Sequence, residues 1–176
     1  PNGWCLGEWS TPHNVIEIPA SLVNTAYFYH VTCIMANIAN ILNKKDDENE
    51  LRILARTIKR NFNIAFYNEV THHYWEGKQG ADVFALAFGL VPESDRKKVF
   101  AALLEHLEKI NYHFDTGILA TPLLLKVLTE NGRADLAYRV MNQRDFPSYG
   151  YLADKKNNTL WETWNGDGND EGCGYC

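Results

Sequence analysis

The feature of this sequence that most constrains its fold is a threefold succession of helical pairs. In each pair, a mostly apolar segment is followed by a segment whose apolar residues recur at spacings of three and four. The apolar members are residues 21–43, 79–89 and 117–130, and the amphipathic members are residues 47–70, 93–111 and 133–142. An apolar helix needs cover on most sides, whereas an amphipathic helix covers a core with one face. The pattern therefore predicts an all-α fold of about six helices in antiparallel pairs.

Two architectures stack helical pairs in this way. A tetratricopeptide-type solenoid repeats pairs of equal length with a fixed signature, whereas an α/α toroid has an inner ring and an outer ring of helices. The pairs of this chain differ in length, and no signature recurs at a fixed period. We therefore expect an incomplete α/α toroid with the apolar helices inside.

Local signals refine this expectation at two places. Asp115 or Thr116 is the expected N-cap of the fifth helix, because short polar side chains accept hydrogen bonds from the first free backbone amides of a helix. Near the C-terminus, residues 149–152 and 158–161 are expected to form short extended pieces around a turn.

The composition bounds the class of protein. A chain of 176 residues with 45% apolar side chains can bury one sizeable core, which predicts a single domain. The net charge of −5 argues against a nucleic-acid partner, because phosphate binding usually needs clustered Lys and Arg residues. The densest cationic run, Arg96-Lys97-Lys98, is typical of the solvent-exposed face of a helix. No run of eighteen apolar residues occurs, so we expect no membrane partner.

Residues with functional side chains gather in the segments before the apolar helices and in residues 149–168. Segments that lead into inner helices share one end of a toroid, so their side chains are expected to surround one cavity. Aromatic faces pack on sugar rings, and His and carboxylate groups bind hydroxyls or transfer protons. The candidate pocket residues are Trp9, Trp75, His113, Trp161 and Trp164, around the candidate catalytic carboxylate of Glu162.

The same residues also have structural interpretations. A Trp in a loop is more often part of the core than a sugar platform, and a Glu between indoles can be an ordinary packed residue. His72 and His73 near Glu76 lack a third ligand at a useful spacing, and Cys173 and Cys176 form a lone C-x-x-C pair. We therefore expect neither a metal nor a cofactor.

Five short motifs occur in an order that is informative. They are Gly7-Glu-Trp9 for G-D-W, Gln79-Gly-Ala81 for Q-x-A, residues 113–117 for H-x-x-T-G, residues 147–151 for P-S-x-G-Y, and residues 159–164 for T-x-W-E-x-W. This succession resembles the inverting α-L-rhamnosidases, whose catalytic domain is a six-hairpin α/α barrel. The likeness covers residues 1–168 as a partial barrel domain, and it is lost in the tail 169–176. The last two motifs together are the specific ones.

The resemblance implies that Glu162 is the general base, which activates a water to attack the anomeric carbon of a terminal α-L-rhamnoside. It also implies a general acid upstream of Gly7-Glu-Trp9, outside this chain, and a carbohydrate as the partner. Glu8 stands where the family has Asp, which lengthens the side chain by one methylene. Because a partial barrel bares the apolar sides of residues 21–43 and 117–130, we expect self-association through that seam.

Two other interpretations stay open. A non-catalytic α-helical scaffold, or a module that binds a carbohydrate or another partner, would use the groove of an open helical array and need no base. A different α/α-barrel glycosidase or lyase would share the layering of helices, but it is not expected to share the T-x-W-E-x-W element.

Overall fold

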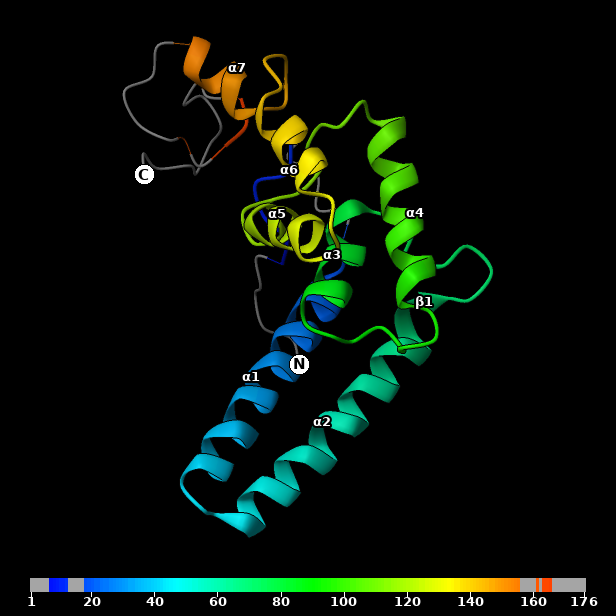
Figure 1. Ribbon diagram of the computed structural model, residues 1–176, viewed down its shortest axis with the longest axis vertical. Coiled ribbons are helices and arrows are strands. Elements are labelled where there is room, and N and C mark those ends of the chain that lie inside the picture. Colours follow the sequence, from blue (N-terminus) through cyan, green and yellow to red (C-terminus); the bar gives the residue numbers. More distant parts are fainter. Residues whose placement is uncertain (1–6, 13–17, 156–160, 162, 166–176) are drawn as a thin grey trace.

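The computed structural model describes residues 7–12, 18–155, 161 and 163–165, and most of these residues belong to helical hairpins (Figure 1). The two longest helices run antiparallel and extend away from the other helices as one arm (Figure 1). The helices in chain order are α1 (Ala20–Ile41), α2 (Lys45–Phe66), α3 (Gln79–Ala87), α4 (Arg96–Lys109), α5 (Ala120–Glu130), α6 (Ala134–Met141) and α7 (Tyr149–Asp154). The predicted all-α class and its six paired helices are confirmed.

The helices form an inner and an outer layer. Within the inner layer, α3 contacts both α1 and α5, and each outer helix contacts the inner helix of its own pair. The burial of side chains follows this division. The first eight residues of α3, Gln79–Leu86, are all buried, whereas α2 buries only Ala55, Ile58 and Phe62. The alternation of apolar and amphipathic segments in the sequence is therefore the alternation of inner and outer helices.

The helix α5 begins differently from the prediction. Its N-cap residue is Leu119, and neither Asp115 nor Thr116 lies at the cap position, so the predicted N-cap was wrong. Residues 117–119 form a turn before the helix, and Thr121 Oγ1 donates a hydrogen bond back to the Gly117 carbonyl at 2.7 Å. The free amides of this turn bind a side chain from far away in the sequence, as the geometry of the cavity shows below.

A two-stranded antiparallel hairpin interrupts the helices. β1 (Tyr67–Asn68) pairs with β2 (His73–Tyr74), and Asn68 Oδ1 accepts hydrogen bonds from the amides of Val70 and Thr71 in the turn between them. The sequence did not predict these strands, because two residues cannot show an alternating pattern.

The predicted extended piece at residues 149–152 is wrong, because this segment forms α7. Ser148 caps the helix: its Oγ accepts a hydrogen bond from the Tyr151 amide at 3.0 Å, which is the usual role of Ser at an N-cap. Of the second predicted piece, residues 158–160 lie outside the described residues.

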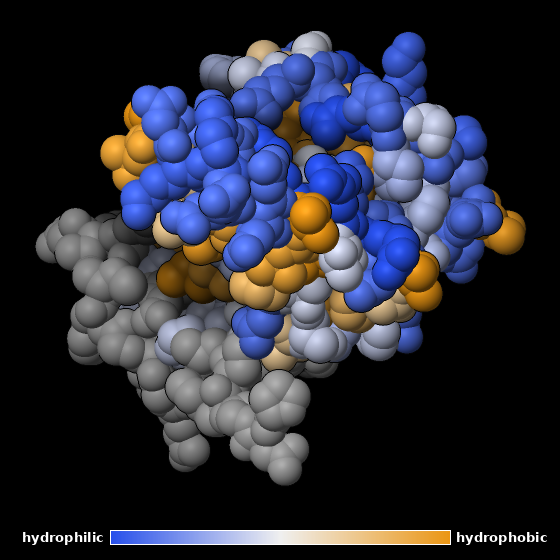
Figure 2. Space-filling view, turned by 90° about the horizontal axis from the view of Figure 1, so that it is seen from below, coloured by the Kyte–Doolittle hydropathy of each residue, from blue (hydrophilic) through white to orange (hydrophobic). Residues whose placement is uncertain are grey.

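The main hydrophobic core lies where α3 packs between α1 and α5. Leu22, Phe84 and Leu124, one from each of these helices, are all fully buried. Further along α1 the apolar side chains lose their cover, and apolar surface is visible among hydrophilic residues from the α1–α2 end (Figure 2). Within the described part of the chain, no helix is long and apolar enough to cross a membrane.

Candidate active site

A cavity of about 170 Å³ lies at the N-terminal end of α5. Its wall is formed by Ser10 from the segment before α1, by the start of α5, and by residues of α7 together with Trp161, Thr163 and Trp164. The lining residues are Ser10, Gly117, Ile118, Thr121, Pro122, Tyr149, Leu152, Trp161, Thr163 and Trp164. Trp161 and Thr163 are the two covalent neighbours of Glu162, which itself lies outside the described residues.

The indole of Trp164 is the best-fixed aromatic group of this cavity. Its ring stacks on Phe114 with centroids 4.9 Å apart and an angle of 21° between the planes, and Tyr149 lies 5.2 Å from it. Its Nε1 donates a hydrogen bond to the Thr116 carbonyl at 3.0 Å. Only 7% of the residue is exposed, so this hydrogen bond satisfies a donor that water cannot reach.

The turn before α5 is held from the other side by the segment Gly7-Glu-Trp9. Glu8 Oε1 accepts hydrogen bonds from the amides of Gly117 at 2.6 Å and Ala120 at 3.0 Å, so Glu8 caps α5 across more than a hundred residues of sequence. The Trp9 carbonyl accepts a third bond from the Ile118 amide at 2.8 Å. A carboxylate at the N-terminus of a helix binds free amides and interacts favourably with the helix dipole.

Burial of Glu8 changes its ionisation. Loss of solvent raises the pKa of this carboxyl from 4.5 to about 7, although the hydrogen bonds from Ala120 and Gly117 act in the opposite direction. The charge of Asp115 contributes to the same increase in pKa. Oε2 is buried and has no hydrogen-bond partner among the described residues, so no donor there stabilises the charged form of the carboxyl.

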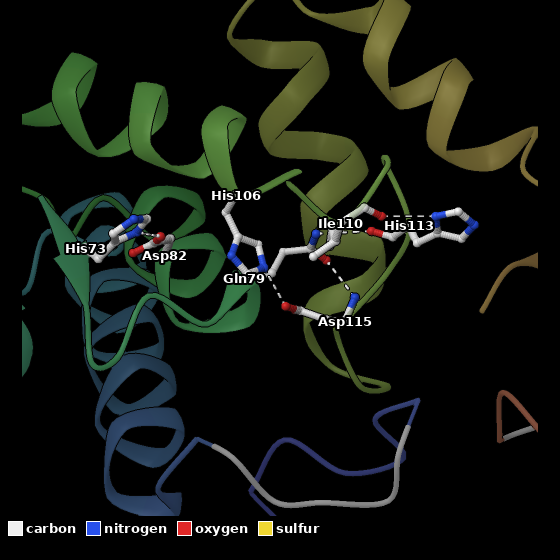
Figure 3. Close-up of polar contacts among 7 residues, drawn as sticks. All are labelled: His73, Gln79, Asp82, His106, Ile110, His113 and Asp115. Atoms are coloured by element: carbon white, nitrogen blue, oxygen red, sulfur yellow. Dashed lines mark hydrogen bonds and ion pairs between the residues drawn. The ribbon is translucent and has the colours of Figure 1, made fainter. Parts of the chain in front are cut away.

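The motif residue Gln79 connects α3 to the segment before α5 (Figure 3). Its Nε2 donates to the His113 carbonyl and its Oε1 accepts from the Asp115 amide, both at 3.3 Å. The next residue, Gly80, allows the helices to approach, because a Cβ there would lie 2.9 Å from Ile18 Cδ1 and 3.3 Å from Ala120 Cβ. Gln79 and Gly80 of the Q-x-A motif therefore hold α3 close to the segment before α5 and to the start of α5.

His113 lies beside a second, more open hollow of about 330 Å³, which also includes Phe114, Asp115 and Asp145 in its wall. Its Nδ1 lies 3.1 Å from the Ile110 carbonyl (Figure 3). Its Nε2 lies 2.9 Å from Asp145 Oδ1. Both partner atoms are acceptors, so the two hydrogen bonds form together only when the ring carries two protons. The bond from His113 lowers the pKa of Asp145.

Two further His–Asp pairs join neighbouring elements (Figure 3). His73 Nδ1 lies 2.6 Å from Oδ2 of the buried Asp82, whose Oδ1 accepts from the Tyr74 amide, so β2 is fixed to α3. Burial raises the pKa of Asp82, and the hydrogen bond with Asp82 raises the pKa of His73. His106 Nε2 lies 2.6 Å from Asp115 Oδ2 and joins α4 to the segment before α5. Among the described residues, no group of three potential metal ligands occurs.

The remaining predicted pocket residues lie at different places. The backbone of Trp9 supports the turn before α5, but its side chain is not among those that line the cavity. Trp75 follows β2, is 38% exposed, and packs edge-on against Phe66, away from the cavity. The structure therefore brings Trp161 and Trp164 together with the turn before α5, and it brings neither Trp75 nor the His113 ring into that wall.

Sequence reasoning missed several residues of the cavity. Ser10, Thr121, Tyr149 and Thr163 contribute to its wall and were not predicted as site residues. Tyr149 and Thr163 stand inside the recognised motifs, so a systematic search of motif neighbours would have included them. Burial raises the pKa of the Tyr149 phenol, so it acts here as a neutral hydroxyl group.

The sequence matches, over residues 1–174, the family described as the bacterial alpha-L-rhamnosidase 6 hairpin glycosidase domain. This chain belongs to that family. It is 37% identical over 163 residues to an alpha-L-rhamnosidase of Streptomyces avermitilis, an alignment that covers 90% of this chain and 15% of the relative. The crystal structure of Streptomyces avermitilis alpha-L-rhamnosidase complexed with L-rhamnose superposes with a TM-score of 0.83 at 36% identity and covers 96% of this chain and 16% of that one.

A second alpha-L-rhamnosidase structure, from Dictyoglumus thermophilum, is similar with a TM-score of 0.86 at 36% identity and covers 92% of this chain and 19% of that one. The chain thus spans less than a fifth of the length of these relatives. In this chain, four of the five recognised motifs meet at the start of α5. The residues that bring them together are Glu8, Gln79, Gly117 and Trp164.

Proposed function

We propose that this chain is part of a glycoside hydrolase that cleaves terminal α-L-rhamnosides with inversion, and that Glu162 is its general base. One observation carries the proposal: the covalent neighbours of Glu162 line an aromatic-walled cavity, in a chain that belongs to the alpha-L-rhamnosidase six-hairpin family. The structure of a relative complexed with L-rhamnose supports the choice of sugar.

The chemistry of inversion requires two carboxyl groups with separate roles. The base removes a proton from the water that attacks the anomeric carbon, and an acid about 6.5–9.5 Å from the base protonates the departing oxygen. No Asp or Glu is among the described residues that line the cavity. Glu8 has the raised pKa of an acid, but its Oε1 is occupied by two amides and its Oε2 is buried away from solvent. We propose, as the family resemblance implies, that the acid lies upstream of Gly7-Glu-Trp9, outside this chain.

The base role is tested in the longer protein that carries this segment. Glu162→Gln keeps the shape of the side chain but cannot take a proton from water, so we expect turnover of a nitrophenyl rhamnoside to fall by about 10²–10⁴-fold, with little change in melting temperature. The matched control is Glu130→Gln, which changes a half-exposed Glu at the end of α5 that is paired with Lys126. Azide or formate is expected to restore turnover to Glu162→Gly. A Glu162→Gln variant with normal turnover would remove Glu162 from the mechanism.

The pocket residues are tested by sugar binding. We propose that Trp161 and Trp164 pack on the sugar ring, and that Trp9, Trp75 and His113 contribute to the wider site. L-rhamnose added to the chain is expected to change its Trp fluorescence. We expect the change to be lost in the Trp161→Ala variant and retained in the Trp75→Ala variant, because Trp75 lies outside the wall of the cavity. Binding of L-rhamnose by the longer protein, combined with no turnover, would favour the alternative of a carbohydrate-binding module.

We also propose that the isolated chain self-associates through α1. Its exposed face presents large apolar side chains with exposed fractions between 41% and 77%, and a groove of about 620 Å³ lies between this face and α2. These side chains are Phe28, Val31, Ile34, Met35, Ile38 and Ile41. Monomers rarely expose so much continuous apolar surface. By contrast, the exposed residues of α5 are Pro122, Lys126, Thr129 and Glu130, so the seam lies on α1.

Sedimentation at increasing concentration tests this surface. We expect oligomers of the original chain, and a monomer after Ile38→Glu, because a charge in a buried apolar contact is costly. The control is Ile64→Glu, which places the same charge on an exposed Ile of α2 outside the groove. A monomeric original chain at high concentration would contradict the proposal.

A further inference from the structure

One peptide group joins Glu8 to Trp164. The amide of Gly117 donates to Glu8 Oε1 at 2.6 Å, and the carbonyl of Thr116 accepts from Trp164 Nε1 at 3.0 Å. This amide and this carbonyl belong to the same planar unit, because residues 116 and 117 share one peptide bond. A rotation of that plane therefore changes both contacts at once.

The surroundings give this peptide group little freedom. A Cβ on Gly117 would lie 1.9 Å from the Trp9 carbonyl oxygen, so the two backbone segments are in direct contact. The Ile118 amide donates to the same oxygen at 2.8 Å. On the far side, the Trp164 ring is stacked on Phe114. The position of the Glu8 carboxyl group and that of the Trp164 indole are therefore tied to the same closely packed peptide group.

Glu8 itself is held in place but does not reach the cavity. It is 1% exposed, its Oε1 binds the Ala120 amide at the start of α5, and a Cβ on Gly80 of α3 would lie 3.8 Å from its Cγ. It is absent from the residues that line the cavity. We infer that Glu8 is a positioning residue, which sets the orientation of the Trp164 indole, and with it one wall of the cavity, through the Thr116–Gly117 peptide group.

The strength of this connection depends on the charge of Glu8. An ionised oxygen is a stronger acceptor than a protonated carboxyl, and a polarised peptide group makes its own carbonyl a stronger acceptor. The groups that face Glu8 are Tyr27 from α1, Asp115 from the segment before α5, and the amides of α5, whereas α3 presents Gly80. Since the pKa of Glu8 is about 7, we expect the Trp164 hydrogen bond to strengthen as the pH rises through neutrality.

The inference rests on the proposed function only where it makes Trp164 a wall of the sugar site. The link between Glu8 and Trp164 is a property of the chain without any ligand. A chain that shows the link but does not respond to L-rhamnose would contradict the proposed function alone, and a chain that binds L-rhamnose without the link would contradict the inference alone.

The test is a pH titration of the full chain by nuclear magnetic resonance, with 15N on the indoles and 13C on the Glu carboxyl groups. The chain has five Trp residues, and the Trp164 indole signal is identified by its loss in Trp164→Phe. We expect this signal to move downfield between pH 5 and 9, with the same midpoint as the Glu8 carboxyl carbon. The Trp75 indole is the internal reference and is expected to show no transition at that midpoint.

Two substitutions distinguish the effect of the Glu8 charge on the Trp164 signal from the effects of neighbouring groups. Glu8→Gln keeps an acceptor oxygen and is expected to abolish the pH response of Trp164 while the signal dispersion of a folded chain remains. Burial is the main cause of the raised pKa of Glu8, and Asp115→Asn removes a charge that adds to it, so the response should persist with a lower midpoint. The outcome does not depend on whether Glu8→Gln folds, because the original chain already compares two midpoints. A Trp164 signal that is flat, or that titrates apart from the Glu8 carboxyl, would overturn the inference.

Discussion

Two apolar inner helices, α5 and α1, are covered to very different degrees. At the start of α5, the backbone of Gly117 is enclosed by Trp9, the amides are bound by Glu8, and Trp164 closes the other side. Along α1, an equally apolar helix leaves large side chains such as Ile41 77% exposed. The first region is defined by directional polar contacts inside a packed core, and the second presents non-directional apolar surface. The first region has the fixed geometry that a binding site requires, and the second is the surface through which we propose that the chain self-associates.

The largest expected effect is that of Gly117→Ala. The new Cβ would collide with backbone atoms of Trp9, which cannot rotate away as a side chain can, so we expect a loss of about 3 kcal/mol or more in the free energy of unfolding. The control Gly89→Ala meets no atom within 4 Å and pays only for its positive φ of 75°, about 1 kcal/mol. Chemical denaturation measures both, and equal losses would show that the start of α5 is not tightly enclosed.

The next effect is the pH dependence of stability that Glu8 causes. The folded pKa of about 7 lies above the ordinary value of 4.5, so the folded chain keeps a proton that the unfolded chain has lost. The free energy of unfolding should therefore fall as the pH rises from 4.5 to 7, by about 3 kcal/mol, and then level off. This contribution is fully present below pH 4.5.

Denaturation of the original chain and of Glu8→Gln at several pH values isolates this contribution, because Asp82 and His73 titrate in both proteins. The difference in stability between the two proteins should change across this range. A constant difference between pH 4.5 and 8 would show that the carboxyl of Glu8 is not shifted by burial.

A smaller effect is expected from Trp164→Phe. The ring can still stack on Phe114, but the buried Thr116 carbonyl loses its donor, which costs about 2 kcal/mol. Trp75→Phe is the comparison, because the 38% exposed side chain of Trp75 leaves water free to replace lost contacts. Thermal unfolding of the two variants should therefore differ, and similar losses would place Trp164 among ordinary surface aromatics.

The smallest effect on stability is expected at the α1 surface. Ile41→Lys should change the free energy of unfolding by less than about 0.5 kcal/mol, because the side chain is already mostly in solvent. Its effect should appear in sedimentation as weaker self-association. A large loss of stability at low concentration, where the chain is monomeric, would show that this surface packs within the chain.

Much of the fold could be predicted because helical periodicity is a local signal. The predicted segment 21–43 became α1 (Ala20–Ile41), and segment 79–89 became α3 (Gln79–Ala87), with similar agreement for the other four. The signal failed where a segment was too short for periodicity. The hairpin of β1 and β2 was missed, and α7 was mistaken for an extended piece although Ser148 provides its N-cap.

The candidate site was predicted less completely. The sequence indicated Trp161 and Trp164 as pocket residues, and both line the cavity. The catalytic role of Glu162, which the resemblance implies, stays a prediction. The division of the chain at residue 168 also stays a prediction, because residues 166–176 lie outside the described residues. Neither Glu8 nor Gly117 could be assigned from spacing, because their contact joins segments that only the packing of helices brings together.

The sequence by itself determined which helices are inner and which are outer, because each helix's burial follows from the distribution of apolar residues around its own axis. Only the tertiary structure decided that Glu8 binds the amides of Gly117 and Ala120 and that Trp164 binds the other side of the same turn. A hydrogen bond depends on distances of a few ångströms between groups far apart in sequence, and no local pattern encodes such a distance. The same burial raises the pKa of Glu8, so the charge of this carboxyl at neutral pH is also a property of the fold.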